Sequence, residues 1–183
     1  MIKRRVEVVQ HPGCVSLPTY ATDGAAGLDV YAARPVHHPT PEERRPWCIA
    51  RDWGVEVTFS DGGITLQPGD RARIPIGISI AVPAGMELQV RPRSGLVWRK
   101  GLTVGNSPGT IDSDYRGPVE VLVINSGRHP IGVKPGDRIA QIVLCPVHRA
   151  QLVSVSELPA TSRGAGGFGS TGVNEAAGRP DAL

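Results

Sequence analysis

The acidic stretch from Gly109 to Gly117 holds the side chains of this chain best suited to activate a water molecule. Asp112 and Tyr115 lie in it, and Asn106 precedes it. A carboxylate is ionised at neutral pH, so Asp112 can orient a water and accept its proton. The amide of Asn106 can both donate and accept hydrogen bonds, and a tyrosine ring can lie against a sugar. An ordinary polar β-turn is the favoured interpretation of the Asp-x-Asp spacing by itself, but these neighbouring residues also suit a site that reads a planar base.

A basic stretch with glycine, Arg91 to Gly95, has the residue types that hold an anion. Arg93 offers a charged fork for phosphate oxygens, Ser94 can cap a helix, and glycine lets a ligand approach the backbone. Amide groups at a helix start also favour an anion. A plain helix cap with solvated arginines explains the same residues equally well.

A glycine-rich string, Arg163 to Gly172, ends the patterned part of the chain. Backbone amides in such loops cradle phosphates, and Arg163, Ser170 and Thr171 add charge and hydroxyl groups. Flexible tails share this composition, but Phe168 is an aromatic ring for which a linker has no use. The string therefore predicts a mobile arm that orders over a ligand as a lid.

Two polar residues in apolar surroundings complete the candidates. Asp29 follows Ala26-Gly27-Leu28, where it could face a metal ion or its waters, with an ordinary strand start as the alternative. Gln141 is an amide within the apolar run that follows the turn at residues 136–137. The histidines show no metal-binding spacing, and the three cysteines form no CxxC pair, so neither a zinc site nor a disulfide framework is indicated.

Short runs of Val and Ile between turn signals place these residues on an all-β frame. The expected strands are 4–9, 27–33, 63–66, 72–82, 86–91, 110–111, 118–125, 132–133 and 138–147, with one short helix at 95–100. The strands at 110–111 and 118–125 flank a turn and are expected to form a hairpin. Two Pro-Gly-Asp turns each feed an apolar strand, which indicates a compact sandwich or jelly roll.

The predicted organisation is one β domain at 1–160 and a glycine-rich arm at 161–183 that cannot build a core. Residues 34–62 form an expected insertion between strands. This segment is polar, is rich in proline, carries Trp47 and Trp53, and has a short structured piece near 53–59 as an expectation.

Composition narrows the function classes. A net charge of +3 fits an anionic ligand but points to no particular one. The basic residues are scattered among acids without interleaved aromatics, which argues against a nucleic-acid polymer as partner. No apolar run is long enough for a signal peptide or a membrane span, so we expect a cytoplasmic protein that does not contact membranes.

Five blocks, in this order, resemble the five motifs of the trimeric dUTPase family. They are AGLD at 26–29, PRSGL at 92–96, GTIDSDYRG at 109–117 with Asn106 ahead of it, GDRIAQ at 136–141 and RGAGGFGSTG at 163–172. The match covers residues 23 to 172 apart from the insertion. It implies a jelly-roll or β-clip fold and a homotrimer with active sites shared between subunits.

The resemblance also implies roles. The reaction would be hydrolysis of dUTP to dUMP and pyrophosphate, which keeps uracil out of DNA and supplies dUMP for dTMP synthesis. Asp112 would be the general base, Tyr115 would pack on the deoxyribose, and Mg²⁺ would be held mainly by the triphosphate, with Asp29 acting through water. The other assignments are Asn106, Gly109, Thr110, Ile111 and Glu120 for uracil, Arg93, Ser94, Gly95 and Gln141 for phosphates, and Arg163, Phe168, Gly169, Ser170 and Thr171 for the closing arm.

Two alternatives accompany this interpretation. A dCTP deaminase of the same broad fold would release ammonia instead, but the complete glycine-rich motif and the intact IDSDYRG block speak against it. A dUTPase body could also bind a protein partner through the 34–62 insertion. Trp98, in the helix after PRSG, departs from the smaller residues common in the family.

Overall fold

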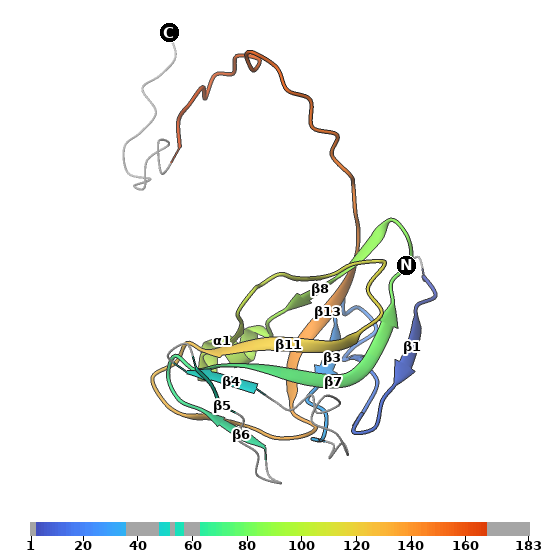
Figure 1. Cartoon of the computed structure of the whole chain (residues 1–183), viewed down its shortest axis with the longest axis vertical. Coiled ribbons are helices and arrows are strands. Elements are labelled where there is room, and N and C mark those ends of the chain that lie inside the picture. Colours follow the sequence, from blue (N-terminus) through green and yellow to red (C-terminus); the bar gives the residue numbers. More distant parts are fainter. Residues whose placement is uncertain (1–2, 36–47, 52–53, 57–62, 168–183) are drawn as a thin grey trace. The chain divides into compact units, whose positions relative to one another are not determined.

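Two antiparallel sheets and a two-stranded ribbon build the unit that spans Met1–His148 (Figure 1). The computed structural model describes residues 3–35, 48–51, 54–56 and 63–167. This part of the chain contains thirteen strands and one helix. The prediction of an all-β fold with one short helix is therefore confirmed.

The strands divide between the sheets as follows. The first sheet runs β5 (Gly54–Glu56), β4 (Cys48–Arg51), β7 (Arg71–Ala81), β11 (Pro118–Asn125) and β9 (Leu102–Val104), with β1 (Glu7–Gln10) also paired to β7. The second sheet runs β10 (Gly109–Ile111), β8 (Met86–Arg91), β13 (Arg138–Pro146), β3 (Leu28–Tyr31) and β2 (Thr19–Tyr20). The ribbon pairs β12 (Ile131–Val133) with β6 (Ile64–Leu66), and the helix α1 (Ser94–Lys100) follows β8.

Alternating side chains of both sheets fill one core. In β11 every second residue is buried, and β7 buries Ile74, Ile76 and Ile78 on its inner face. They join Leu88 and Val90 of the second sheet in a single apolar cluster. Figure 1 shows β7 and β11 side by side, with β13 behind them. Each such side chain contributes about 1.5–3 kcal/mol of burial free energy, so the sandwich holds its sheets rigidly beneath the site.

The two Pro-Gly-Asp turns have the same geometry, as their shared sequence predicts. Asp70 accepts a hydrogen bond from the Gln67 amide at 2.8 Å, and Asp137 accepts one from the Lys134 amide at 2.8 Å. The central glycines have φ of +86° and +88°, a left-handed conformation that favours glycine. The second of these turns delivers the chain into β13.

The predicted hairpin of residues 110–111 and 118–125 is wrong. β10 pairs with β8 in the second sheet, whereas β11 pairs with β7 and β9 in the first. The segment from Asp112 to Gly117 therefore crosses from one sheet to the other. Sequence proximity suggested the pairing, but burial of both strands against the core decided it.

Part of the expected insertion belongs to the first sheet. β4 pairs with β5 and with residues Arg71 to Arg73 of β7, whose other end pairs with β1. The insertion thus covers a stretch of sheet edge, which is otherwise open to unwanted pairing. β5 lies within the structured piece expected near 53–59, while Trp47 and Trp53 fall outside the described residues.

The second unit spans Arg149–Leu183, whereas the predicted arm begins at residue 161. Its described residues form a turn around Gly164, whose amide donates to Oγ1 of Thr161 at 3.2 Å. The string from Phe168 to Thr171, predicted to close a site, lies outside the described residues. No helix in the described ranges is long and apolar enough to cross a membrane.

Candidate active site

Four residues predicted to bind phosphate meet in one pocket of about 520 Å³. They are Arg93, Ser94 and Gly95 at the start of α1, and Gln141 on β13. Strand register explains the meeting, because Gln141 lies opposite Arg91 at the end of β8, directly before the PRSG turn. On its other side Gln141 lies opposite Asp29 of β3, which also lines the pocket.

Asp29 is a buried carboxylate that bridges two arginines. Its relative exposure is 7%, and its Oδ1 accepts a hydrogen bond from Nε of Arg93 at 3.0 Å. Its Oδ2 accepts one from an Arg138 guanidinium nitrogen, also at 3.0 Å. A buried charge needs such partners, so Asp29 fixes where both guanidinium groups lie.

Arg138 is a site residue that the sequence did not reveal. A regular strand alternates its faces, which would place residues 138 and 141 on opposite sides. A register shift between Arg138 and Ala140 instead sets Arg138 opposite Tyr31, while Gln141 is opposite Asp29. Ile139 and Ala140 are consequently both buried. This irregularity turns Arg138 onto the face of Gln141, and bulges next to active sites often redirect side chains in this way.

Gly27 makes room for the Gln141 amide. A Cβ at this position would stand 2.6 Å from Oε1 of Gln141. Nε2 of the same amide donates to the Pro92 carbonyl at 3.0 Å. The AGLD block thus supports the pocket through a missing side chain as well as through Asp29.

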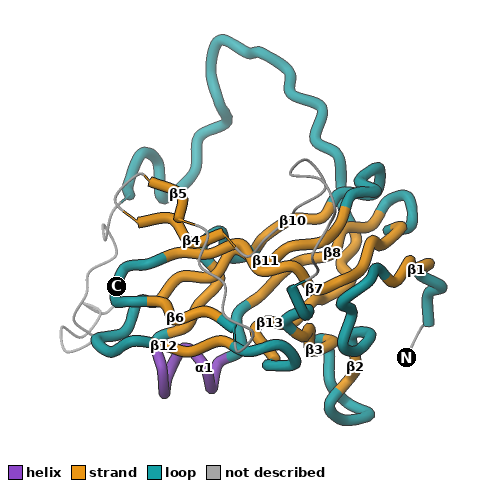
Figure 2. The backbone as a smooth tube through the Cα atoms, turned by 60° about the horizontal axis from the view of Figure 1, so that its bottom comes forward, coloured by secondary structure: helices purple, strands orange, loops and turns teal. Residues whose placement is uncertain are grey.

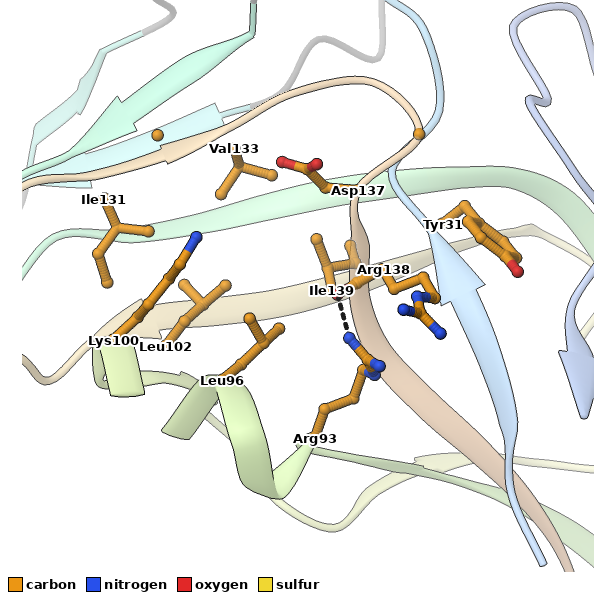
Figure 3. Close-up of a pocket in the computed structure, with 12 residues that line it drawn as sticks. Tyr31, Arg93, Leu96, Lys100, Leu102, Ile131, Val133, Asp137, Arg138 and Ile139 are labelled. Carbon is orange, nitrogen blue, oxygen red and sulfur yellow. Dashed lines mark hydrogen bonds between the residues drawn. The ribbon is translucent and has the colours of Figure 1, made fainter. Parts of the chain in front are cut away.

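A second pocket, of about 310 Å³, adjoins the first (Figure 3). The two share a wall made by Arg93, Leu96, Lys100 and Arg138. Figure 3 shows Arg93 reaching from α1 toward β13, where its guanidinium donates to the Arg138 carbonyl at 3.3 Å. This bond and the Asp29 pair hold Arg93 at two points, so its fork is fixed before any ligand binds.

The loop that carries Asp112 is built as a firm turn with a free carboxylate. The amide of Tyr115 donates to the Asp112 carbonyl at 3.2 Å, and the Tyr115 hydroxyl donates to the Pro118 carbonyl at 2.9 Å. Arg116 donates to the carbonyls of Ser113 and Tyr115. The Asp112 side chain is exposed and makes no hydrogen bond or ion pair within the described residues. A carboxylate in this state is available to hold a water.

The residues predicted to read a base cluster near the start of this loop. A Cβ on Gly109 would stand 3.1 Å from Nδ2 of Asn106, so glycine brings the β10 backbone against that amide. Thr110 is exposed and Ile111 is buried. Glu120 lies on β11, where its side chain pairs with Arg73 at 3.6 Å. Glu120 is thus already engaged by a charge from β7.

Strand register separates this loop from the phosphate pocket. Ile111 lies opposite Leu88, and the pocket begins five residues further along the chain at Arg93. Because β10 runs antiparallel to β8, Asp112 continues to the level of Glu87, six residues before Arg93. At about 3.3 Å per strand residue, Asp112 and Arg93 stand roughly 20 Å apart along one chain. No residue of the Asp112 loop lines the phosphate pocket.

Among the remaining predicted residues, Arg163 lies in the described part of the chain. Its side chain bends back onto its own turn, where Nε donates to the Gly166 carbonyl at 2.8 Å. Trp98 is 89% exposed on α1 and lines neither of the two pockets.

A β-sandwich with a prearranged cationic pocket and a firm loop bearing a free carboxylate defines an all-β hydrolase of a phosphorylated substrate. A family model described as dUTPase matches residues 59–172. The deoxyuridine 5'-triphosphate nucleotidohydrolase of Desulfotalea psychrophila is 50% identical over 159 residues, which cover 87% of this chain and 89% of the relative. The chain belongs to the dUTPase family.

Solved structures agree on the fold. A dUTPase of Staphylococcus bacteriophage 80alpha, solved with dUPNHPP, superposes with a TM-score of 0.68 at 21% identity, covering 93% of this chain and 100% of that one. A mutant dUTPase from phage phi11 of S. aureus, whose structure reveals the coordination of a structural Mg(II) ion, gives 0.63 at 17% identity and covers 84% and 98%. At such identities the likeness shows the fold alone.

Proposed function

We propose that this chain hydrolyses dUTP to dUMP and pyrophosphate, with Asp112 activating the attacking water. One observation carries the site assignment: Arg93, Ser94, Gly95 and Gln141, from blocks far apart in sequence, line a single pocket. A pocket with fixed guanidinium and amide donors suits a triphosphate, because charge-assisted hydrogen bonds to phosphate are strong and oriented. In the cell this activity keeps uracil out of DNA and provides dUMP for dTMP synthesis, in the cytoplasm.

The active site is completed between subunits of a homotrimer. The separation of roughly 20 Å along one chain keeps Asp112 from acting on a phosphate that Arg93 of the same subunit holds. A neighbouring subunit that places its own Asp112 loop against this pocket brings the carboxylate close to the bound phosphate. The arm from residue 161 onward then covers the assembled site, with Phe168 stacking on uracil and Arg163, Gly169, Ser170 and Thr171 near the phosphates.

The chemistry assigned to the chain's own residues is simple. Asp112 orients a water for in-line attack on the α-phosphorus and accepts its proton as the new P–O bond forms. The bond from the α-phosphorus to the bridging oxygen breaks, and pyrophosphate leaves against Arg93 and Gln141. Asn106 and the backbone of Gly109, Thr110 and Ile111 read the uracil edge, beside Glu120. Tyr115 packs on the deoxyribose and excludes a 2′-hydroxyl.

Magnesium fits this pocket as a companion of the triphosphate. Mg²⁺ prefers oxygen ligands and usually binds through substrate phosphates with few protein carboxylates. Asp29 is the carboxylate in the pocket lining, and both its oxygens already accept hydrogen bonds from arginines. Asp29 can therefore contact the ion through water, while the ion neutralises charge on the phosphates when bound.

A nucleotide panel tests the function. The full chain is incubated with dUTP, dCTP, dTTP and UTP, with and without magnesium, while pyrophosphate and ammonia are followed. We expect pyrophosphate from dUTP far above the other nucleotides. Ammonia from dCTP would instead establish the deaminase, and equal turnover of dUTP and UTP would remove the role given to Tyr115.

A further inference from the structure

The last turn of α1 presents two cations that no motif explains. Arg99 and Lys100 both line the phosphate pocket, and both side chains are exposed. Neither makes a hydrogen bond or an ion pair within the described part of the chain. Arg93 and Arg138, by contrast, are engaged with Asp29. The pocket therefore holds four cationic side chains and one carboxylate, with two of the cations uncompensated.

Arg99 and Lys100 follow the predicted phosphate-binding residues Ser94 and Gly95 along α1. Gly95 and Arg99 are four residues apart and lie on one face of the helix. At 1.5 Å per residue, Arg99 stands about 6 Å further along the axis than Gly95. Lys100 belongs to the wall between the two pockets, and Figure 3 shows it rising from the end of α1. A ligand anchored at Ser94 and Gly95 that extends along α1 therefore meets these two charges next.

We propose that Arg99 and Lys100 bind the distal phosphates of the substrate's triphosphate tail and so favour a triphosphate over shorter phosphates. The inference rests on the proposed function and adds to it two residues outside the five motif blocks. A long anionic tail supplies the counter-charges that the described residues of the chain do not give them. Arg93, Ser94, Gly95 and Gln141 hold the part of the tail nearest the reacting phosphorus.

A purely structural role for the same residues makes a different prediction. Cations in the last turn of a helix interact favourably with its C-terminal end and stabilise it. Replacing them would then lower the melting temperature and leave anion binding unchanged. Binding of a free tripolyphosphate separates the two roles, because it reports on the pocket without any turnover.

The experiment titrates tripolyphosphate, pyrophosphate and orthophosphate into the full chain by calorimetry, without magnesium. The variants are Arg99→Gln, Lys100→Gln and the double variant. Arg4→Gln is the matched control, since it removes one exposed charge from a residue that lines neither pocket. We expect tripolyphosphate to bind about threefold more weakly to each single variant and about tenfold more weakly to the double variant at low salt.

Orthophosphate binding should change less than about twofold, and raising the salt to about 0.5 M should erase most of the difference through screening. In turnover, KM for dUTP should rise in parallel while kcat stays within about twofold. Tripolyphosphate affinity equal to that of the Arg4→Gln control, or undetectable in the wild type, would overturn the inference. A wild type that binds tripolyphosphate without hydrolysing dUTP would remove the proposed function and leave the result on Arg99 and Lys100 standing.

Discussion

At the scale of single residues, hydrogen bonds from neighbouring residues hold the loop of Asp112 without help from its own side chain. The turn is held by Tyr115 and Arg116, while the Asp112 carboxylate is exposed and unpaired among the described residues. A change of its side chain should thus leave the loop intact. A substitution of Asp112 therefore tests general-base catalysis separately from the integrity of the loop.

We expect Asp112→Asn to reduce kcat by about 10²–10⁴-fold, the range usual for loss of a general base. Binding of a non-hydrolysable dUTP analogue should stay within a few-fold of the wild type, because the amide keeps the shape of the carboxylate. Pyrophosphate release and calorimetry measure the two quantities. Turnover close to that of the wild type would exclude Asp112 as the base.

Gly27 affects the site because its missing side chain leaves room for the Gln141 amide. In Gly27→Ala the new methyl group must displace the Gln141 amide, because a Cβ at this position would lie 2.6 Å from Oε1. The bond from Gln141 to the Pro92 carbonyl is then lost, and we expect KM for dUTP to rise about tenfold, equivalent to about 1.4 kcal/mol. Gly24→Ala is the control, since nothing lies within 4 Å of its Cβ position. Equal KM values in both variants would show that the Gln141 position is unimportant.

At the scale of elements, α1 depends on a close backbone contact at its C-terminal end. Gly101 has φ of +77°, and its amide donates to the Val97 carbonyl at 2.9 Å. A Cβ there would collide with the backbone of Gly127, which lies two residues after Asn125. Asn125 is fully buried and donates to the Leu66 and His129 carbonyls at 2.9 Å each. The end of β11 thus sets the position of the helix that carries the phosphate residues.

Gly101→Ala should lower the free energy of unfolding by about 3 kcal/mol, the sum of left-handed strain and a backbone collision. Urea denaturation followed by circular dichroism measures it. Gly69→Ala shares the positive φ but meets nothing within 4 Å, and should cost about 1 kcal/mol. Comparable losses in the two variants would mean that the approach to Gly127 adds no constraint.

The register shift in β13 is a structural feature of the strand that its amino-acid sequence does not predict. Predicted strand boundaries agree closely with the structure, as at 86–91 and 118–125. The irregularity between Arg138 and Ala140 carries no glycine or proline that would signal it in the sequence. It nevertheless decides that Arg138 joins Asp29 and Gln141.

At the scale of the whole molecule, the proposed site has two halves in each chain. The phosphate half comes from β3, α1 and β13, and the half that carries Asp112 and the base-reading residues comes from β10, the start of β11 and their flanking segments (Figure 2). Figure 2 shows α1 next to β12 and β6. If a neighbouring subunit joins the halves, two different inactive variants can complement each other.

We expect subunits carrying Asp112→Asn and subunits carrying Arg93→Gln to be nearly inactive alone. After unfolding together and refolding as mixed trimers, about a quarter of the sites should combine an intact Asp112 loop with an intact pocket, as random assembly in a closed ring requires. Pyrophosphate release from the mixture measures the recovery. Mixed trimers, verified by mass spectrometry of the native assembly, that stay inactive would place both halves of the site in one subunit.

The grouping of Arg93, Ser94, Gly95 and Gln141 as phosphate-binding residues came from the resemblance to the dUTPase motifs. The sequence by itself determined the fold class, the short helix and both Pro-Gly-Asp turns. These features depend on local rules: β-branched runs between turn residues, glycine at positive φ, and polar residues in apolar runs. The motif order supplied the remaining assignments by resemblance. None of these required knowledge of which strands pair.

The tertiary structure decided the features that depend on pairing between distant strands. It assigned β10 and β11 to different sheets, extended the first sheet with part of the insertion, and brought Arg138 to Asp29 across the shifted register of β13. Among the described residues, it also gave Arg99 and Lys100 no acidic partner beside the pocket. The physical reason is common to the first three features, because a strand's partner and register follow from burying the inner faces of both sheets together, and this balance is not encoded in any short stretch of sequence.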